Sequence, residues 1–473
     1  MADSREQFGS KLGFILAAAG SAVGIGNLVG FPVGAAKNGG GAFLLMYAVF
    51  VFFICLPVMI AEMTVGRSAQ KDPLGAYTDL SNRNPGWRFA GWLSIVTPFM
   101  IAVFYLVITV WIFGYLFESV IGNLDELAQP ETFGTFINSY NLFVYMAGVI
   151  AIVYLILQGG VKKGIEKAAK ILMPALFFML LVLVIFVLTR DNAMAGVAFY
   201  LVPDFDKIDA SVVNGALSQA FFSLSLGMGI MITYGSYIDK RADLPGSAKL
   251  VALTDTAVAF TAGLMILPAI FSFNPEVNPE ELSESSISMI FSYLPQIFLE
   301  MQSTFGYVGA SAIASIFFLL VFFAAITSLV SIFEVPVAAL MSEKGMERKK
   351  SLMVCGAGLI IFSVFCALSF GFVTFFTEFF NYAGSTKSFF DVVYDVFYDT
   401  ILPLNGLLIC LFVIYRWKKA NFNEELDRGA PNFKGSIFER YVNFSLGTFI
   451  PVILLVIFVN TVALKYFGVA LIG

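Results

Sequence analysis

An apolar segment near the start of the chain, residues 12–35, interrupts its own helical pattern close to its middle. Three glycines and Asn27 lie there, about halfway along a stretch long enough to cross a membrane. In lipid, backbone N–H and C=O groups that leave the helix find no water, and each unsatisfied group costs several kcal/mol. Residues 223–229 interrupt a later apolar segment in the same way. Two interrupted helices at matching places of two half-chains are typical of a binding site between structural repeats.

Hydrophobic residues make up 59% of the 473-residue chain and charged residues only 13%, whereas about a quarter of the residues of a soluble domain are charged. The chain is therefore predicted to be an all-α polytopic membrane protein. Eleven transmembrane helices are predicted from segment length, at residues 12–36, 42–66, 89–120, 141–158, 170–189, 214–238, 248–272, 306–341, 351–371, 388–415 and 441–470. The absence of histidine excludes His-based proton relays and triads.

The positions of the basic residues predict the orientation. If the N-terminus is cytoplasmic, all but five of the 28 Lys and Arg residues fall in inner segments, as the positive-inside rule requires. The five outer residues are Lys37, Arg190, Lys207, Lys387 and Lys465. We therefore expect a multi-pass protein of the cell inner (plasma) membrane, with a cytoplasmic N-terminus and, after eleven spans, a C-terminus outside.

The two interrupted helices are the first and the sixth, so the first ten helices form two sets of five. An odd number of spans inverts the second set relative to the first, which predicts a 5+5 inverted repeat with broken helices 1 and 6 and a binding site between the repeats. We expect a single transporter domain over 1–473. Its parts are a first repeat, an exterior loop, a second repeat, and an inner loop with helix 11, at residues 1–190, 191–213, 214–417 and 418–473.

Several motifs resemble the neurotransmitter:sodium symporter family, which includes the bacterial leucine transporter and eleven-helix bacterial amino-acid symporters. The motifs are residues 13–43, which end in the run Phe-Pro-Val-Gly-Ala-Ala-Lys-Asn-Gly-Gly-Gly-Ala-Phe, residues 62–67, the interrupted sixth helix, and Thr327 with Ser328. The resemblance implies a sodium-coupled secondary symporter that moves an L-amino acid by alternating access.

Sodium is a hard cation that prefers oxygen ligands, and interrupted helices offer backbone carbonyls. By resemblance, we expect two sodium sites. The first takes the Ala22 carbonyl with Asn27, Ser223 and Asp255, and the second takes the carbonyls of Gly20, Val23 and Ala324 with the hydroxyls of Thr327 and Ser328. Positions 324, 327 and 328 share one helix face, although Ser and Thr in membrane helices also bond to their own backbone.

Asp255 lies about eight residues inside its predicted helix, hence about 12 Å from the helix start at 1.5 Å per residue. An intramembrane carboxylate is a functional-site hypothesis by default. Chloride-dependent members of the family obtain a negative charge from a bound anion. We expect Asp255 to supply this charge, so that chloride is not required. The alternative is that Asp255 pairs with a neighbouring hydroxyl for structural reasons.

The resemblance also implies how an amino acid binds. Its carboxylate would meet the free N–H groups of residues 24–26, at the N-terminus of the outer half of the first helix, and its ammonium would meet carbonyls of the unwound segments. The expected substrate-binding residues are Ser21, Ala22, Val23, Gly24, Gly26, Ile101, Tyr105, Phe222, Ser223, Ser225, Met228, Ser331 and Ile332. The adaptable Met228 favours a roomy apolar pocket, and thus a hydrophobic or aromatic L-amino acid.

Alternating access needs a gate on each side of the site. By resemblance, the inner gate uses Arg5, Phe8 and Tyr237, with Glu343 as the acidic partner.

Glu62 is another intramembrane carboxylate. It is expected to cap backbone of the broken segment, and the alternative is a carboxylate at a helix end near the cytoplasmic interface.

The outer gate departs from the family pattern. The family has an arginine and an aspartate where this chain has Gly30 and Tyr394, with Asp395 adjacent. The outer salt bridge is thus lost on both sides together. We expect closure by Tyr105, Phe222 and the packing of Tyr394 instead.

Two other functions are compatible with the same architecture. A proton-coupled amino-acid transporter of this architecture commonly has a lysine of the fifth helix where the second sodium ion would bind. Here residues 171–188 contain no Lys or Arg, and both hydroxyl residues of the second sodium site, Thr327 and Ser328, are present. Sodium is therefore favoured. A non-transporting amino-acid sensor is the second alternative.

An enzyme is not expected, because the sequence has no paired nucleophile and base, phosphate loop or metal cluster. The expected partners are an amino acid and the lipid bilayer, with no nucleic acid and no obligate protein partner.

Overall fold

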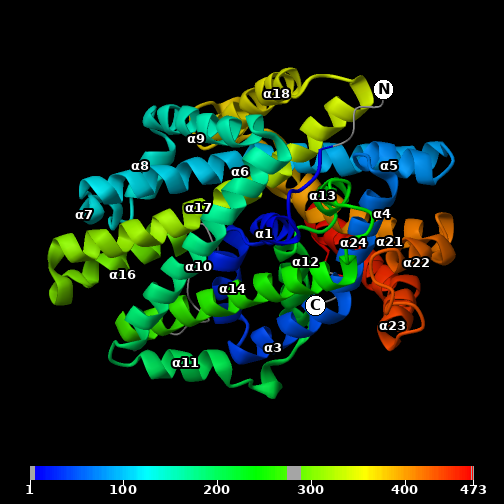
Figure 1. The fold of residues 1–473 in the computed structure, drawn as a ribbon. Helices are drawn as coiled ribbons and strands as arrows, with labels where there is room; N and C mark the ends of the chain where they lie inside the picture. The colour runs from blue at the N-terminus through cyan, green and yellow to red at the C-terminus, as the bar shows by residue number, and fades with distance from the viewer. Residues whose placement is uncertain (1–5, 274–288, 470, 472–473) are drawn as a thin grey trace.

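The computed structural model describes residues 6–273, 289–469 and 471, and this part of the chain is almost entirely helical (Figure 1). The strands among the described residues are β1 (Phe380–Tyr382) and β2 (Ser385–Lys387), which form an antiparallel hairpin. The prediction of a helical polytopic protein is therefore confirmed, with this short hairpin as an addition.

Nine helical segments of the described chain are long and apolar enough to cross a membrane. They are α3 (Gly41–Phe50) with η2 (Val51–Cys55) and α4 (Leu56–Ala69); α6 (Pro85–Ile121); α9 (Asn141–Gln158); η3 (Val161–Ile165) with α10 (Glu166–Leu188); α14 (Leu244–Phe273); α17 (Gln302–Lys344); α18 (Arg348–Leu368); α20 (Phe389–Val393) with η7 (Tyr394–Ile401), α21 (Leu402–Leu411) and η8 (Phe412–Arg416); and α23 (Ile437–Gly447) with α24 (Phe449–Phe467). Each contains or overlaps one predicted span.

The first predicted span is present as a bent pair. α1 (Lys11–Ala22) is followed by η1 (Gly26–Gly30) and α2 (Phe31–Lys37), and the two halves meet at 56°. The predicted sixth span consists of α12 (Ala210–Ser223) and α13 (Ile230–Gly235), separated by an irregular stretch. With 14 and 6 residues, neither half of this second pair is long enough to cross a membrane alone. The described structure thus supports up to ten spans by length and composition.

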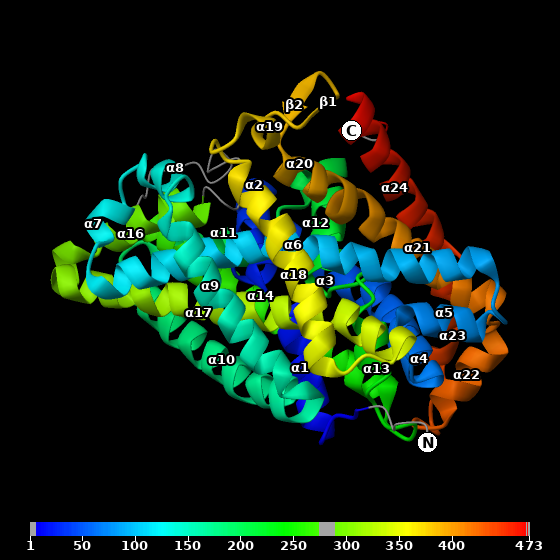
Figure 2. The same cartoon turned by 90° about the horizontal axis from the view of Figure 1, so that it is seen from above.

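Short helices connect the long ones. They are α5 (Pro73–Leu80), α7 (Leu124–Leu127), α8 (Thr132–Ile137), α11 (Ala193–Leu201), η4 (Phe205–Lys207), η6 (Met289–Tyr293), α16 (Leu294–Glu300), α19 (Thr374–Thr377) and α22 (Lys419–Asp427). In Figure 2, α7, α8 and α16 lie at one end of the molecule, and α22 and α23 lie at the other.

The two broken helices lie in the middle of the bundle (Figure 1). α1 packs against α10, α14 and α17, while α13 packs against α4 and α17. The backbone at both breaks is therefore surrounded by longer helices and not by solvent. Polar side chains from those helices must satisfy it.

A buried ion pair joins the end of α4 to α22. Arg67 is fully buried, and its Nε lies 2.8 Å from Glu425 Oε1. The Arg67 Nη1 also donates to the Ala242 carbonyl at 2.6 Å, in the segment after α13. Arg428 lies 3.1 Å from the other carboxylate oxygen of Glu425. One guanidinium thus connects three segments that are far apart in the sequence.

We expect Arg67→Met to destabilise the protein by about 3–5 kcal/mol, because it leaves the Glu425 carboxylate buried without its main partner. The matched control is Lys71→Met, since the Lys71–Asp79 pair has both side chains 45% exposed and such surface pairs contribute about 0–1 kcal/mol. The measurement is the melting temperature of the purified protein in detergent. Equal melting temperatures for the two variants would contradict the role given to Arg67.

Candidate substrate and ion site

The first break brings α1 very close to α6 and α17. α1 ends at Ala22, and helical structure resumes only at Ile25. A Cβ atom on Gly24 would lie 2.8 Å from Ser328 Oγ and 3.0 Å from Tyr105 OH, which is closer than a side chain tolerates. The Ile25 N–H donates to the Tyr105 hydroxyl at 3.5 Å. Gly24 thus lets the free backbone of the break face polar side chains of two neighbouring helices.

Asp255 on α14 is the centre of a buried polar cluster beside this break. Its carboxylate accepts hydrogen bonds from Asn27 Nδ2 at 2.7 Å, Ser223 Oγ at 2.9 Å and Tyr47 OH at 3.0 Å. Asn27 Oδ1 accepts the Gly24 N–H at 3.0 Å. The structure thus brings together the three side chains expected at the first sodium site. It adds Tyr47 on α3, which the sequence did not indicate because a tyrosine in an apolar helix is usually packing.

A second group of oxygens gathers on the other side of the break. Ser328 Oγ lies 3.5 Å from the Gly20 carbonyl oxygen and 3.3 Å from that of Val23. Thr327 Oγ1 donates to the Ala324 carbonyl at 3.0 Å, within its own helix. The five residues expected at the second sodium site therefore lie together. Thr327 also makes the local bond that was the alternative interpretation of its hydroxyl.

Side chains from other helices satisfy the backbone at the second break. Glu62 Oε1 on α4 accepts the Gly227 N–H at 2.7 Å, and Asn405 Nδ2 on α21 donates to the Gly227 carbonyl at 2.9 Å. Ser225 Oγ donates to the Ser21 carbonyl at 2.9 Å and so connects the two breaks. Glu62 is buried, and it caps the second broken segment.

Most of the expected substrate residues lie buried at or near the two breaks. The buried apolar members include Val23, Ile101, Met228 and Ile332. Ser331 Oγ donates to Ser21 Oγ at 2.7 Å. Gly26 differs, because it is exposed and its carbonyl accepts a hydrogen bond from Gln219 Nε2 at 2.9 Å. Gly26 is therefore open to solvent, unlike the buried members of this set.

Four aromatic side chains, which we call the aromatic wall, lie next to the site: Phe104, Phe222, Tyr394 and Tyr398. The Phe222 and Tyr398 rings stack with centroids 4.3 Å apart, Tyr398 lies 4.8 Å from Tyr394, and Tyr394 lies 5.2 Å from Phe104. Tyr394 and Phe222 were expected at an outer gate, whereas Tyr398 was missed. Asp395, also expected there, instead lies 2.9 Å from Lys465 Nζ on α24.

A further set of contacts joins Phe8, in the N-terminal segment, to Tyr237. The Phe8 N–H donates to the Tyr237 carbonyl at 3.0 Å, and the two rings pack edge-on at 6.2 Å. The Tyr237 hydroxyl donates to Glu334 at 2.7 Å, and Arg348 Nη2 lies 2.5 Å from the same carboxylate. Glu334 thus joins α17, α18 and the segment after α13.

The acidic residue at this contact is Glu334, which was not predicted from the sequence, whereas the expected pairing of Glu343 with Arg5 stays a prediction. Glu343 lies by α5, with Oε1 3.1 Å from the position that a Cβ of Gly75 would occupy, and Glu334 takes the place beside the tyrosine. A carboxylate inside the predicted span 306–341 was a signal for Glu334. Arg5, the expected basic partner, lies outside the described residues.

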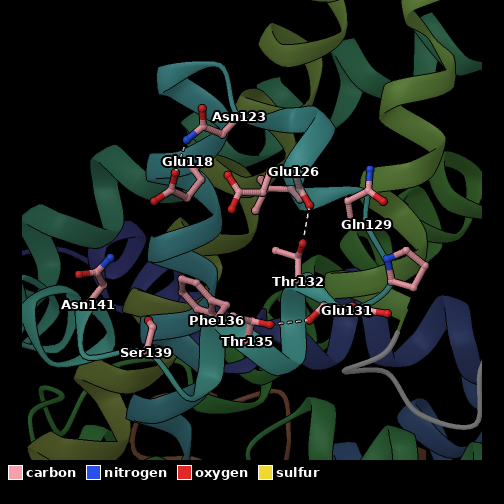
Figure 3. Close-up of a pocket in the computed structure, with 12 residues that line it drawn as sticks. Glu118, Asn123, Glu126, Gln129, Glu131, Thr132, Thr135, Phe136, Ser139 and Asn141 are labelled. Atoms are coloured by element: carbon pink, nitrogen blue, oxygen red, sulfur yellow. Dashed lines mark hydrogen bonds between the residues drawn. The ribbon is translucent and has the colours of Figure 1, made fainter.

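A hollow of about 600 Å³ lies at the end of α6, among α7 and α8 (Figure 3). Several of its polar side chains bond within the same stretch of chain. Asn123 Nδ2 donates to Glu118 at 2.7 Å, and Thr132 Oγ1 donates to the Glu126 carbonyl at 2.6 Å. The lining residues all come from 118–141, and none is an expected substrate residue. This hollow is separate from the site at the breaks.

A helical membrane protein with a broken first helix beside two clusters of oxygen atoms has the architecture of a secondary transporter. Residues 5–133 and 134–468 match the model of the Sodium:neurotransmitter symporter family. The chain belongs to this family, as the sequence motifs predicted, and members of the family are transporters and not enzymes.

Comparisons with individual proteins agree with this assignment. A sodium-dependent transporter of Bacillus subtilis (strain 168) is 33% identical over 469 residues, which cover 98% of each chain. The human sodium- and chloride-dependent taurine transporter is 28% identical over 62% of this chain and 54% of its own length. The crystal structure of MhsT in complex with L-phenylalanine superposes with a TM-score of 0.80 at 37% identity and covers 96% of this chain and 99% of that one.

We expect Glu62→Leu to destabilise the protein by about 1–3 kcal/mol, because the buried Gly227 N–H loses its acceptor. Glu62→Gln is the matched control. It retains an acceptor oxygen and should recover much of the loss. The melting temperature in detergent, without added amino acid, measures both. A leucine variant as stable as the glutamine variant would show that the cap contributes nothing.

Proposed function

We propose that the protein is a sodium-driven symporter of an L-amino acid with a hydrophobic or aromatic side chain. The observation that carries the proposal is the junction of the two breaks, where Ser225 and Ser331 contact Ser21 between the Asp255 and Ser328 clusters. Backbone groups released there can hold both the charged ends of an amino acid and the driving cations.

Sodium binds at two sites in this proposal. At the first, the ion takes the Ala22 carbonyl, Asn27, Ser223 and Asp255, and it replaces the Asn27 N–H as a partner of the carboxylate. At the second, it takes the carbonyls of Gly20, Val23 and Ala324 with the hydroxyls of Thr327 and Ser328. Buried charges in proteins are paired or coordinate metals, and the hydrogen-bond partners of the Asp255 carboxylate are neutral donors.

The amino acid lies between the two breaks. The N–H groups at residues 24–26 and Tyr105 take its carboxylate, and carbonyls of the unwound segments take its ammonium. Its side chain meets Ile101, Phe222, Met228 and Ile332. An aromatic or large aliphatic substrate suits this lining, and the similarity to MhsT, whose crystal structure contains L-phenylalanine, supports the same choice.

Transport proceeds by alternating access. The aromatic wall closes one side, and the contacts of Phe8, Tyr237, Glu334 and Arg348 close the other. Eleven spans follow if α12 and α13 form one crossing, and five helices on each side of residues 191–213 then make the inverted repeat. The N-terminus is cytoplasmic, the C-terminus is outside, and the chain functions in the plasma membrane without an obligate partner protein.

Uptake of labelled L-phenylalanine into proteoliposomes that contain only this chain tests the function. We expect uptake with an inward Na⁺ gradient and none when K⁺ replaces Na⁺. Asp255→Ala and Ser328→Ala should each weaken the apparent Na⁺ affinity about tenfold or more, the equivalent of one ligand contributing about 1.4 kcal/mol. Uptake driven equally well by a proton gradient would favour a proton-coupled transporter. Sodium-dependent binding without uptake would favour a sensor.

Replacement of chloride tests the role of Asp255 separately. We expect uptake to be unchanged when gluconate replaces chloride, because the Asp255 carboxylate already supplies a negative charge beside the first sodium site. The Asp255→Asn variant is the matched comparison, since it keeps the size of the side chain and removes the charge. A strict chloride requirement in the unsubstituted protein would reject this role.

A further inference from the structure

An ion cluster lies on the side of η7 that faces α24. Lys465 Nζ on α24 is 2.9 Å from Asp395 Oδ1 and 2.6 Å from Asp399 Oδ2. The Tyr382 hydroxyl of strand β1 donates to the second oxygen of Asp395 at 2.7 Å. The Asp395 side chain is only 6% exposed and the Asp399 side chain 17%. Charges inside a helical membrane segment are costly and usually functional.

The residue directly before each of these two carboxylates belongs to the aromatic wall. Tyr394 and Tyr398 directly precede Asp395 and Asp399 in the chain, and their rings lie on Phe104 and Phe222. Neighbouring positions on a helix point in different directions. The same turn therefore presents carboxylates to α24 and aromatic rings to the site.

The backbone that carries Tyr394 and Tyr398 has an unusual helical form. η7 is a π-helix of eight residues, Tyr394–Ile401. π-helical segments are rare, and they frequently occur at functional sites. Contacts with neighbouring elements, α24 among them, help to fix the rotation of η7 and thus the directions of Tyr394 and Tyr398. α24 packs beside η7 (Figure 2) and supplies the lysine.

We propose that Lys465 is a positioning residue for the outer gate. By holding Asp395 and Asp399 together, it orients η7 so that Tyr394 and Tyr398 stay packed against Phe104 and Phe222 and close the site. The eleventh predicted helix, which lies outside the inverted repeat, thereby acts on the gate. The inference rests on the proposed function in one respect only, namely that the aromatic wall closes the substrate site of that function.

The test is the labelling rate of a cysteine placed at Ile101, which is buried one turn before Phe104 on α6, on the inner side of the aromatic wall in the predicted orientation. A membrane-impermeant methanethiosulfonate reagent is applied to proteoliposomes in NaCl without amino acid. The four native cysteines are buried, and the parent without Ile101→Cys measures their background. We expect Lys465→Met to accelerate labelling at least fivefold and Lys465→Arg to stay within twofold.

Two further variants separate positioning from a general structural role. Tyr466→Phe removes the neighbouring contact of Tyr466 with Thr400, at 3.0 Å, and should leave the labelling rate within twofold. Lys465→Met combined with Asp395→Asn and Asp399→Asn leaves no uncompensated charge, so it remains testable where the single variant fails to fold, and it should label as fast as Lys465→Met.

Unchanged labelling in folded Lys465→Met or in the triple variant would overturn the proposal. So would the failure of both to fold while Lys465→Arg folds, because the cluster would then serve the whole bundle and not the gate. The labelling needs no amino acid. Its result therefore decides the role of Lys465 even if L-phenylalanine uptake fails and the proposed function is rejected.

Discussion

Backbone groups that leave a helix in apolar surroundings must find new partners, and both breaks are built around this need. Glu62 and Asn405 take the N–H and the carbonyl of Gly227, and Asn27 takes the Gly24 N–H. Glu62 and Asn405 come from α4 and α21, whereas Asn27 belongs to the first broken helix itself. The irregular backbone therefore exists only in the assembled bundle, and the groups it leaves over form the site.

The charged side chains inside the bundle divide into two kinds. Several form ion pairs that join segments far apart in the sequence, as Arg67 does with Glu425 and Arg348 with Glu334. Asp255 is held instead by neutral donors from three other helical segments. A buried carboxylate with neutral partners retains its attraction for a cation. Glu62 also has a neutral partner, the Gly227 N–H, but Asp255 has two hydroxyls and an amide around it.

Much of the candidate site could be predicted because its residues are polar or helix-breaking within otherwise apolar helical segments. Glycines and hydroxyls in apolar segments, and Asp255 deep in a helix, are visible without any structure. Tyr47 and Tyr398 were missed, because a tyrosine in an apolar helix is compatible with simple packing. Glu334 was missed as well, although it is a carboxylate inside a predicted span, where it contacts Tyr237 and Arg348.

The sequence by itself determined the class of protein, the family, the lengths of the apolar segments and the places where two helices break. These properties depend on local composition, because a bilayer-spanning length and an unsatisfied backbone are set within one segment. Only the tertiary structure decided which side chains meet: Tyr47 with Asp255, Glu334 with Arg348, and Lys465 with Asp395. Such contacts depend on the rotation and depth of each helix against its neighbours, and those are set by the packing of the whole bundle.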